Sequence, residues 1–177
     1  MLNDTSEEAL TSSEIEELLQ TFSSRDPDVQ TFLHSRAIQF EREDKCRTYL
    51  LVGEDGNIHA YFSISTKELT LCKFDISSTQ RKRMKINPQD EEQRVRCFLI
   101  GQLGKNFAIE TPVTLKEILD EVDAIVIQAQ TLVGNRLLIL ECNAQLIPSY
   151  QACNFKNLPV QPDKVPPILE TMYKFIN

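Results

Sequence analysis

Apolar residues recur every three or four positions in three parts of the chain, which is the spacing of one face of an α-helix. The first stripe predicts a helix over residues 13–23, with Ser13 as its N-cap and Glu16 as the partner in a capping box. The second stripe predicts a helix over about residues 29–43. We therefore expect two helices before the first strand.

The third stripe begins after Thr114 and is the longest. Glu117 follows Thr114 at the capping-box spacing, so the pair predicts a helix start. Gly134-Asn135 then supplies residues that commonly end a helix. We expect one long helix between these two signals.

Strands are predicted where apolar residues run together or alternate with polar ones. These segments cover residues 48–52, 58–64, 97–103, 137–141, 155–158 and 172–176. Asp55-Gly56 between the first two is a hairpin signal, and the second run continues its alternation to Leu71. A short helix around Tyr150 follows the fourth strand. The polar segment 75–96 and the proline-rich segment 159–167 are expected to be loops.

This order of elements predicts the fold class. Helices alternate with strands in the second half, which implies at least one parallel pair, and the hairpin supplies antiparallel ones. We expect an α/β protein with a mixed, mostly antiparallel sheet flanked by helices. One domain should span residues 1–177, with 1–12 a flexible or loosely packed N-terminus.

Composition narrows the functional classes. The 177 residues are 41% hydrophobic, enough for one sizeable core, and the net charge of −7 disfavours nucleic acid and anionic membranes as general partners. No segment reaches the roughly 18 apolar residues of a membrane span. The acidic start does not resemble a signal peptide. Five cysteines without close-paired spacing favour reduced thiols and a cytoplasmic location.

Candidate metal ligands and thiol nucleophiles are few. His34 and His59 are expected to be solvated or locally hydrogen-bonded, and without a CxxC pair no metal site is predicted. Cys142 and Cys153 lie on either side of Tyr150, but no histidine is near them in sequence. Cysteine catalysis is therefore not expected.

Tyr150 is the main candidate for chemistry. It follows the apolar strand 137–141 and a polar turn, on a short helix that leads into Phe155. This arrangement can place a phenolic proton donor near a cofactor thiol. The alternative is an ordinary half-buried tyrosine with a wet hydroxyl.

Two segments resemble the GCN5-related N-acetyltransferase (GNAT) superfamily, over most of the chain. The run 98–103 looks like the central strand of that family, whose end binds the pantetheine arm of acetyl-CoA. Tyr150 with Asn154-Phe155 is similar to the family's Tyr-x-x-x-Gly-Phe segment, and Asn143 stands where the family often has Asn. A weaker similarity is to the acetyltransferases of toxin–antitoxin pairs.

The resemblance implies a set of site residues. Tyr150 would protonate the leaving CoA thiolate. The backbone at Leu103, Gly104 and Lys105 would orient the thioester. The amides of Val113, Thr114 and Leu115, together with Asn143, would complete the acetyl-CoA site. Glu141 is either a general base or a carboxylate bonded to backbone.

The phosphate loop departs from the family pattern. The family usually has Gln/Arg-x-x-Gly-x-Gly/Ala before the long helix, whereas this chain has Glu-Thr-Pro-Val-Thr-Leu at residues 110–115. Pro112 lacks an amide proton, and Glu110 brings negative charge toward the phosphates. Acetyl-CoA affinity should therefore be reduced.

The expected function is acetyl transfer from acetyl-CoA to an amine acceptor, catalysed with Tyr150 as the acid. The rival is a non-catalytic GNAT-fold protein that acts as a protein-interaction or ligand-binding module. The basic segment 81–85 is interpreted as a solvated loop, with tRNA phosphates as the alternative partner. No membrane partner is expected. The last strand and exposed leucines leave a homodimer open.

Overall fold

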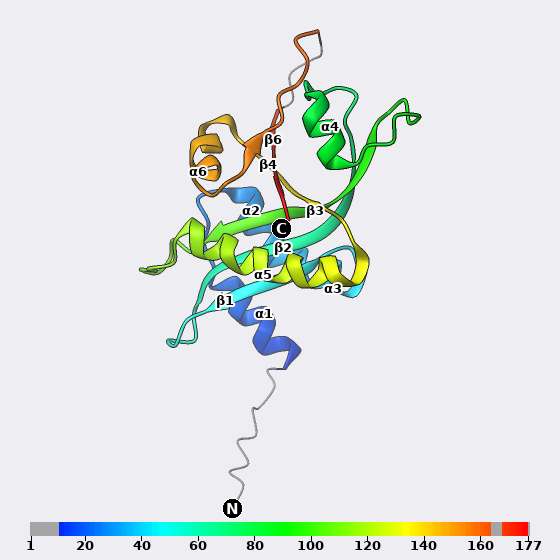
Figure 1. Ribbon diagram of the computed structural model, residues 1–177. Helices are drawn as coiled ribbons and strands as arrows, with labels where there is room; N and C mark the ends of the chain where they lie inside the picture. Colours follow the sequence, from blue (N-terminus) through cyan, green and yellow to red (C-terminus); the bar gives the residue numbers. More distant parts are fainter. Residues whose placement is uncertain (1–10, 164–167, 177) are drawn as a thin grey trace, which may run out of the picture.

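One six-stranded sheet, in the order β1-β2-β3-β4-β6-β5, organises the protein. The computed structural model describes residues 11–163 and 168–176 (Figure 1). The strands are β1 (Arg47–Val52), β2 (Ile58–Thr70), β3 (Arg94–Lys105), β4 (Leu137–Cys142), β5 (Lys156–Asn157) and β6 (Glu170–Phe175). The helices are α1 (Ser12–Gln20), α2 (Pro27–Ser35), α3 (Ala37–Arg42), α4 (Ser78–Met84), α5 (Leu115–Val133), α6 (Ile147–Ala152) and the 3-10 turn η1 (Ala144–Leu146).

Strand directions confirm the predicted fold class, a mixed and mostly antiparallel sheet flanked by helices. β1 with β2, β2 with β3, β4 with β6 and β5 with β6 are antiparallel pairs. β3 and β4 are parallel, because the chain crosses over through α5 between them. The predicted hairpin is also confirmed: Gly56 has φ +75°, a value that glycine adopts without strain, in the turn between β1 and β2.

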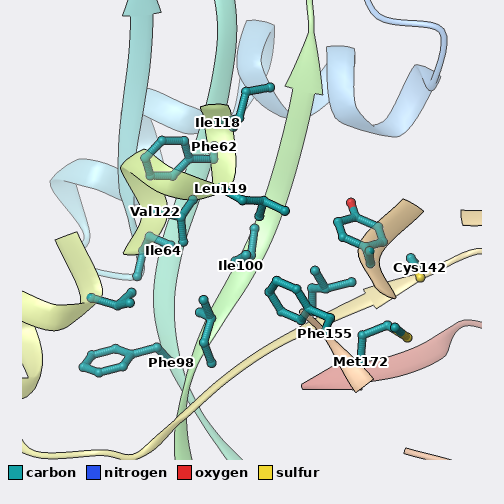
Figure 2. Close-up of a cluster of buried hydrophobic side chains, with 14 of the residues drawn as sticks. Phe62, Ile64, Phe98, Ile100, Ile118, Leu119, Val122, Cys142, Phe155 and Met172 are labelled. Atoms are coloured by element: carbon teal, nitrogen blue, oxygen red, sulfur yellow. The ribbon is translucent and has the colours of Figure 1, made fainter. Parts of the chain in front are cut away.

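The sheet carries helices on both faces (Figure 1). α5 covers one face, and α1, α2 and α3 pack together over the opposite face of β2. The inner stripe of α5 consists of Ile118, Leu119, Val122 and Val126, each no more than 2% exposed. Burying each such side chain contributes about 1.5–3 kcal/mol. Figure 2 shows this core, in which the stripe meets aromatic and aliphatic residues of β2 and β3.

The first helix begins earlier than predicted, so the expected cap was wrong. Thr11, not Ser13, is the N-cap: its Oγ1 accepts from the Glu14 N–H, and the Glu14 carboxylate accepts from the Thr11 N–H at 2.7 Å. The Ser13–Glu16 pair satisfies the same pattern. The earlier box prevails because each residue added to a formed helix gains another backbone hydrogen bond.

The single helix predicted over residues 29–43 is two helices. Arg36 ends α2, where its N–H donates to the Phe32 carbonyl, and α3 begins directly after it. In one continuous helix, residues eight positions apart would be separated by about 12 Å along the axis. The break lets the rings of Phe32 and Phe40 meet edge to face with centroids 5.5 Å apart.

The polar segment 75–96 contains a helix that the apolar pattern did not predict. Ser77 caps α4, since its Oγ accepts from the Gln80 N–H while Gln80 Oε1 accepts from the Ser77 N–H at 2.8 Å. The basic segment 81–85, expected to be a loop, forms the last turn and C-cap of this helix. α4 buries Met84, so its apolar stripe is too short to show a helical period.

Several other boundaries also differ from the prediction. The strand expected at 97–103 is longer in the structure, where β3 runs from Arg94 to Lys105. The strand expected at 155–158 is shorter, because β5 consists of Lys156 and Asn157. Residues 1–10 of the expected flexible N-terminus lie outside the described residues, as do 164–167 of the expected proline-rich loop. Within the described ranges, no helix is long and apolar enough to cross a membrane.

Candidate functional site

The two central strands separate partway along their length. β3 and β4 are in parallel register at three positions, from Phe98 with Leu138 to Ile100 with Leu140. Beyond Ile100, β3 runs on to Lys105 with β2 on its other edge, while β4 continues beside β6. The facing backbone edges of β3 and β4 therefore lack a strand partner from this point, and a cleft of about 420 Å³ opens there.

A bulge in β3 marks the point of separation. Ser63 of β2 pairs with Gln102, and the next residue, Ile64, pairs with Ile100, so Gly101 is an extra residue on β3. A bulge bends its strand and increases the local twist. An added Cβ at Gly101 would lie 3.2 Å from Ser63 Oγ, so a larger residue would crowd the bulge.

Tyr150 lines this cleft from α6. β4 ends at Cys142, and η1 turns the chain so that α6 returns beside the cleft. Tyr150 is only 8% exposed, and its hydroxyl has no hydrogen-bond partner among the described residues. Burial raises the pKa of this hydroxyl to about 12, with smaller effects from Cys142 and Cys153. The cleft therefore holds a neutral phenol whose polar group is unpaired.

The end of α6 fixes the orientation of Tyr150. Asn154 has a left-handed backbone with φ +67°, and its N–H donates to the Gln151 carbonyl at 3.0 Å. The Phe155 N–H donates to the Tyr150 carbonyl at 3.0 Å, which completes a Schellman motif. The rings of Tyr150 and Phe155 lie edge to face, 5.9 Å apart. Asn154 is thus a permitted substitute for glycine, since Asn tolerates the left-handed region.

Acidic and apolar groups from other elements complete the lining. Asp26, Asp28 and Val29 come from the start of α2, and Glu141 comes from β4. The apolar rim is formed by Leu146, Ile168 and Leu169.

Gly104 explains why the start of α2 reaches the cleft. A Cβ at this position would lie 2.6 Å from Val29 Cγ1 and 3.2 Å from the Phe22 ring, so only glycine leaves room for α2 across β3. The Tyr61 hydroxyl also donates to the Val29 carbonyl at 2.5 Å. Asp26 caps the helix by accepting from the Asp28 N–H at 2.9 Å.

The start of α5 is the second predicted binding region. Thr114 is its N-cap, as predicted, and the Glu117 carboxylate accepts from both the N–H and the Oγ1 of Thr114 at 2.7 Å. These bonds lower the pKa of Glu117, the side-chain bond most. Val113 and Leu115 pack against the main core, and the Val113 N–H donates to Thr111 Oγ1 at 3.3 Å. The carboxylate of Glu117, a negatively charged group of the protein itself, therefore occupies this helix N-terminus.

The structure brings together only part of the predicted set. Tyr150, Asn143 and Leu103 line the cleft, whereas Gly104 and Lys105 do not belong to its described lining. Asp26 and Asp28 were missed, because their place in the cleft depends on long-range packing that no local motif announces. Glu117 was predicted as a cap but not as a competitor for phosphate.

Glu141 and the two histidines are the other polar groups for which the sequence left alternatives open. Glu141 lines the cleft and accepts from Lys67 Nζ at 2.7 Å, so its observed partner is a lysine and not the backbone, while the general-base role stays a prediction. His34 Nε2 lies 2.8 Å from the Phe22 carbonyl oxygen, and His59 contacts Thr111 and Asp55, as expected for locally bonded histidines.

No protein-family model and no curated protein matches the sequence. Solved structures do match the fold. A tyrosine-to-phenylalanine mutant of KacT is 19% identical with a TM-score of 0.72, and the match covers 89% of this chain and 87% of that one. AtaT complexed with acetyl-methionyl-tRNAfMet is 16% identical with a TM-score of 0.69, covering 89% and 86%. AtaTR bound with acetyl-CoA is 14% identical with a TM-score of 0.63, covering 89% and 85%.

AtaT is a toxin, and KacT and AtaT share the GNAT fold. The comparison confirms that this chain has the same fold, as its sequence segments indicated. At such low identity, the likeness establishes the fold alone.

Proposed function

We propose that the protein is an N-acetyltransferase that moves the acetyl group of acetyl-CoA to an amine. One observation carries the proposal: Tyr150 presents a buried phenol, unpaired among the described residues, to the cleft between the diverging strands of a GNAT fold. A solved structure of the same fold, AtaTR, is bound with acetyl-CoA, which supports the choice of cosubstrate.

The separated edge of β3 suits an amide-containing arm. Beyond Ile100, the backbone of β3 offers N–H and C=O groups toward β4 that no described strand satisfies. A pantetheine arm carries amides that can pair with such an edge as another strand would. In this proposal, the backbone from Leu103 to Lys105 orients the thioester, and Asn143 borders it from the opposite strand.

The start of α5 is where the pyrophosphate would bind, since a helix N-terminus favours anions. Of the three amides predicted to bind it, those of Val113 and Thr114 already donate to Thr111 and Glu117. The Leu115 amide has no acceptor among the described residues. Binding therefore requires Glu117 to release Thr114, and this rearrangement would weaken acetyl-CoA affinity.

Acetyl-CoA would supply the acyl group as an activated thioester. The neutral amine nitrogen attacks the carbonyl carbon and forms the C–N bond, and a backbone N–H of β3 would stabilise the oxygen that becomes negative. The C–S bond then breaks and its electron pair leaves with sulfur. The carbonyl re-forms as sulfur leaves, Tyr150 gives its proton to that sulfur, and water returns to Tyr150 the extra proton that the attacking nitrogen carries after the C–N bond forms.

The environment of Tyr150 supports this role. Burial disfavours the phenolate, so the hydroxyl remains protonated at neutral pH. The same desolvation would raise the pKa of a thiolate formed beside it, which makes proton transfer to sulfur easier. Glu141 is less suited to be the base, because its carboxylate is bonded to Lys67.

Replacing Tyr150 with Phe tests the proposal. The variant keeps the ring that packs against Phe155 but removes the proton donor. We expect kcat to fall by about 100-fold or more, with the dissociation constant of acetyl-CoA and the melting temperature almost unchanged. CoA thiol release measures the rate. An unchanged kcat would rule out Tyr150 as the acid.

The rival function is a non-catalytic module on the same fold. Glu117 at the start of α5 and the glycine-free segment 110–115 favour it, because both oppose phosphate binding. Absence of acetyl-CoA binding, and of turnover with any amine, would select this rival.

A further inference from the structure

The described lining of the cleft is acidic. It contains Asp26, Asp28 and Glu141, and no lysine, arginine or histidine belongs to its described part. Lys67 pairs with Glu141 from outside the lining at 2.7 Å. Neither Asp26 nor Asp28 forms an ion pair within the described ranges. Two exposed carboxylates at the start of α2 therefore border the cleft without an ion pair, and Asp26 also caps α2 by accepting from the Asp28 N–H.

Two arginines of the described residues lie over aromatic rings outside the cleft lining. The Arg25 guanidinium lies 4.2 Å from the Phe107 ring centroid, and Arg83 lies over the Phe175 ring at 3.8 Å. α4, with the basic segment 81–85, packs through Met84 in the cluster that includes Val95 at the beginning of β3. The cleft opens toward the other end of that strand. Phosphates of a nucleic acid would thus meet negative charge at the cleft.

These carboxylates belong to a built cleft and are not an isolated acidic patch. The Tyr150 side chain lines the same cleft and is only 8% exposed, and its hydroxyl has no hydrogen-bond partner among the described residues. Its hydroxyl stays accessible from the cleft, because the fully buried polar side-chain atoms without a partner in the described residues are Thr48 Oγ1 and Asn157 Oδ1. The phenol and the carboxylates therefore border one space.

The chemistry of acetyl transfer determines which positive charge the carboxylates can recognise. The attacking nitrogen must be neutral, so it cannot be the cation that Asp26 and Asp28 attract. A second aliphatic amine, with an ordinary pKa near 10.4, stays charged at neutral pH. The apolar groups Val29, Leu146 and Leu169 can contact the methylene chain that links the two nitrogens.

We infer that the acceptor is an aliphatic amine with a second positive charge, of the diamine or polyamine class, held through that charge by Asp26 and Asp28. This inference rests on the proposed function and specifies its acceptor. An aminoacyl-tRNA, such as the one bound by AtaT, is disfavoured by the charge of the same cleft.

A pair of acceptors tests the inference. Acetyl-CoA-dependent acetylation of spermidine is compared with that of hexylamine, which has a similar reactive nitrogen and chain but no second charge. We expect kcat/KM to be about tenfold higher for spermidine at low salt. The difference should shrink as salt screens the carboxylates. Equal values for the two amines, or a preference for aminoacyl-tRNA, would overturn the inference.

A double variant and a control variant test whether Asp26 and Asp28 cause the preference for spermidine. Asp26→Asn together with Asp28→Asn removes both charges, and Asn at position 26 still serves as a helix N-cap. The KM for spermidine should rise about tenfold, with little change in kcat or in the constants for hexylamine. Glu91→Gln, an exposed carboxylate outside the cleft lining, is the matched control and should leave every constant unchanged.

The results separate this inference from the proposed function. The inference alone is overturned if spermidine and hexylamine are acetylated equally well. It is also overturned if replacing both carboxylates leaves the KM for spermidine unchanged. No acetyl transfer to spermidine, hexylamine or aminoacyl-tRNA overturns the inference and the proposed function together.

Discussion

Tyr150 shows at the scale of one residue how burial prepares a side chain for acid catalysis. Burial raises the pKa of its hydroxyl from 10.0 to about 12. Because the folded-state pKa is the higher one, stability from the neutral phenol is fully present below about pH 10 and is lost as the pH rises through about 12. The proton that the proposed mechanism uses is therefore held across the neutral and mildly alkaline range.

A pH profile checks this expectation. The value of kcat at saturating amine should show no alkaline decline up to about pH 10, since the phenol is still protonated there. The profile is measured for the wild type, with a stability curve at each pH to separate unfolding from titration. An alkaline limb centred near pH 8 while the protein remains folded would contradict the role of Tyr150.

Asn154 is the second residue whose conformation matters to the proposed site. Asn154→Ala should lower the free energy of unfolding by about 1 kcal/mol, because alanine resists the left-handed backbone at φ +67°. Asn154→Gly should leave stability almost unchanged. Urea unfolding measures both, with the exposed Gln151→Ala as the control. Equal effects of Ala and Gly would show that the Schellman turn does not depend on this backbone.

Hydrogen bonds between residues close together in sequence could be predicted at this scale, whereas contacts between residues far apart in sequence could not. Thr114 and Glu117 were predicted as a capping box, since the signal spans one helical turn. The same rule chose Ser13 wrongly, because Thr11 satisfies it as well. Asp26 and Asp28 could not be found, since their place depends on Gly104, far away in sequence.

At the scale of elements, the start of α5 serves two conflicting purposes. The Glu117 carboxylate stabilises the helix through Thr114, yet it occupies the place that a phosphate would need in the proposed complex. Glu117→Gln keeps a side chain that can complete a capping box and removes the negative charge.

We expect Glu117→Gln to strengthen acetyl-CoA binding by about threefold, since a helix N-terminus favours an anion that no longer competes with a carboxylate. Calorimetric titration measures the dissociation constant, and Glu16→Gln on α1 is the control. A weaker or unchanged affinity would show that the phosphates do not bind at this helix.

Most elements were predictable where an apolar period extended over enough residues. α5 and the central strands have long stripes or runs, so their existence followed from the sequence. α4 was missed because Met84 is the residue it buries, although Ser77-x-x-Gln80 is a capping signal. The break at Arg36 was missed because apolar spacing continues through it.

At the scale of the whole molecule, the site arises where the sheet divides. The order of helices and strands was enough to predict the mixed sheet. The point at which β3 leaves β4 was not predictable, because it follows from the bulge at Gly101 and the pairing of β4 with β6. The homodimer stays a prediction, as does the single domain.

The central claim is that acetyl-CoA binds where β3 and β4 diverge, and hydrogen exchange tests it most directly. Backbone amides are compared with and without saturating acetyl-CoA. The account predicts slower exchange over residues 101–105 and at the start of α5, with no change in β1, which lies at the far edge of the sheet. Protection elsewhere, or no protection at millimolar acetyl-CoA, would contradict it.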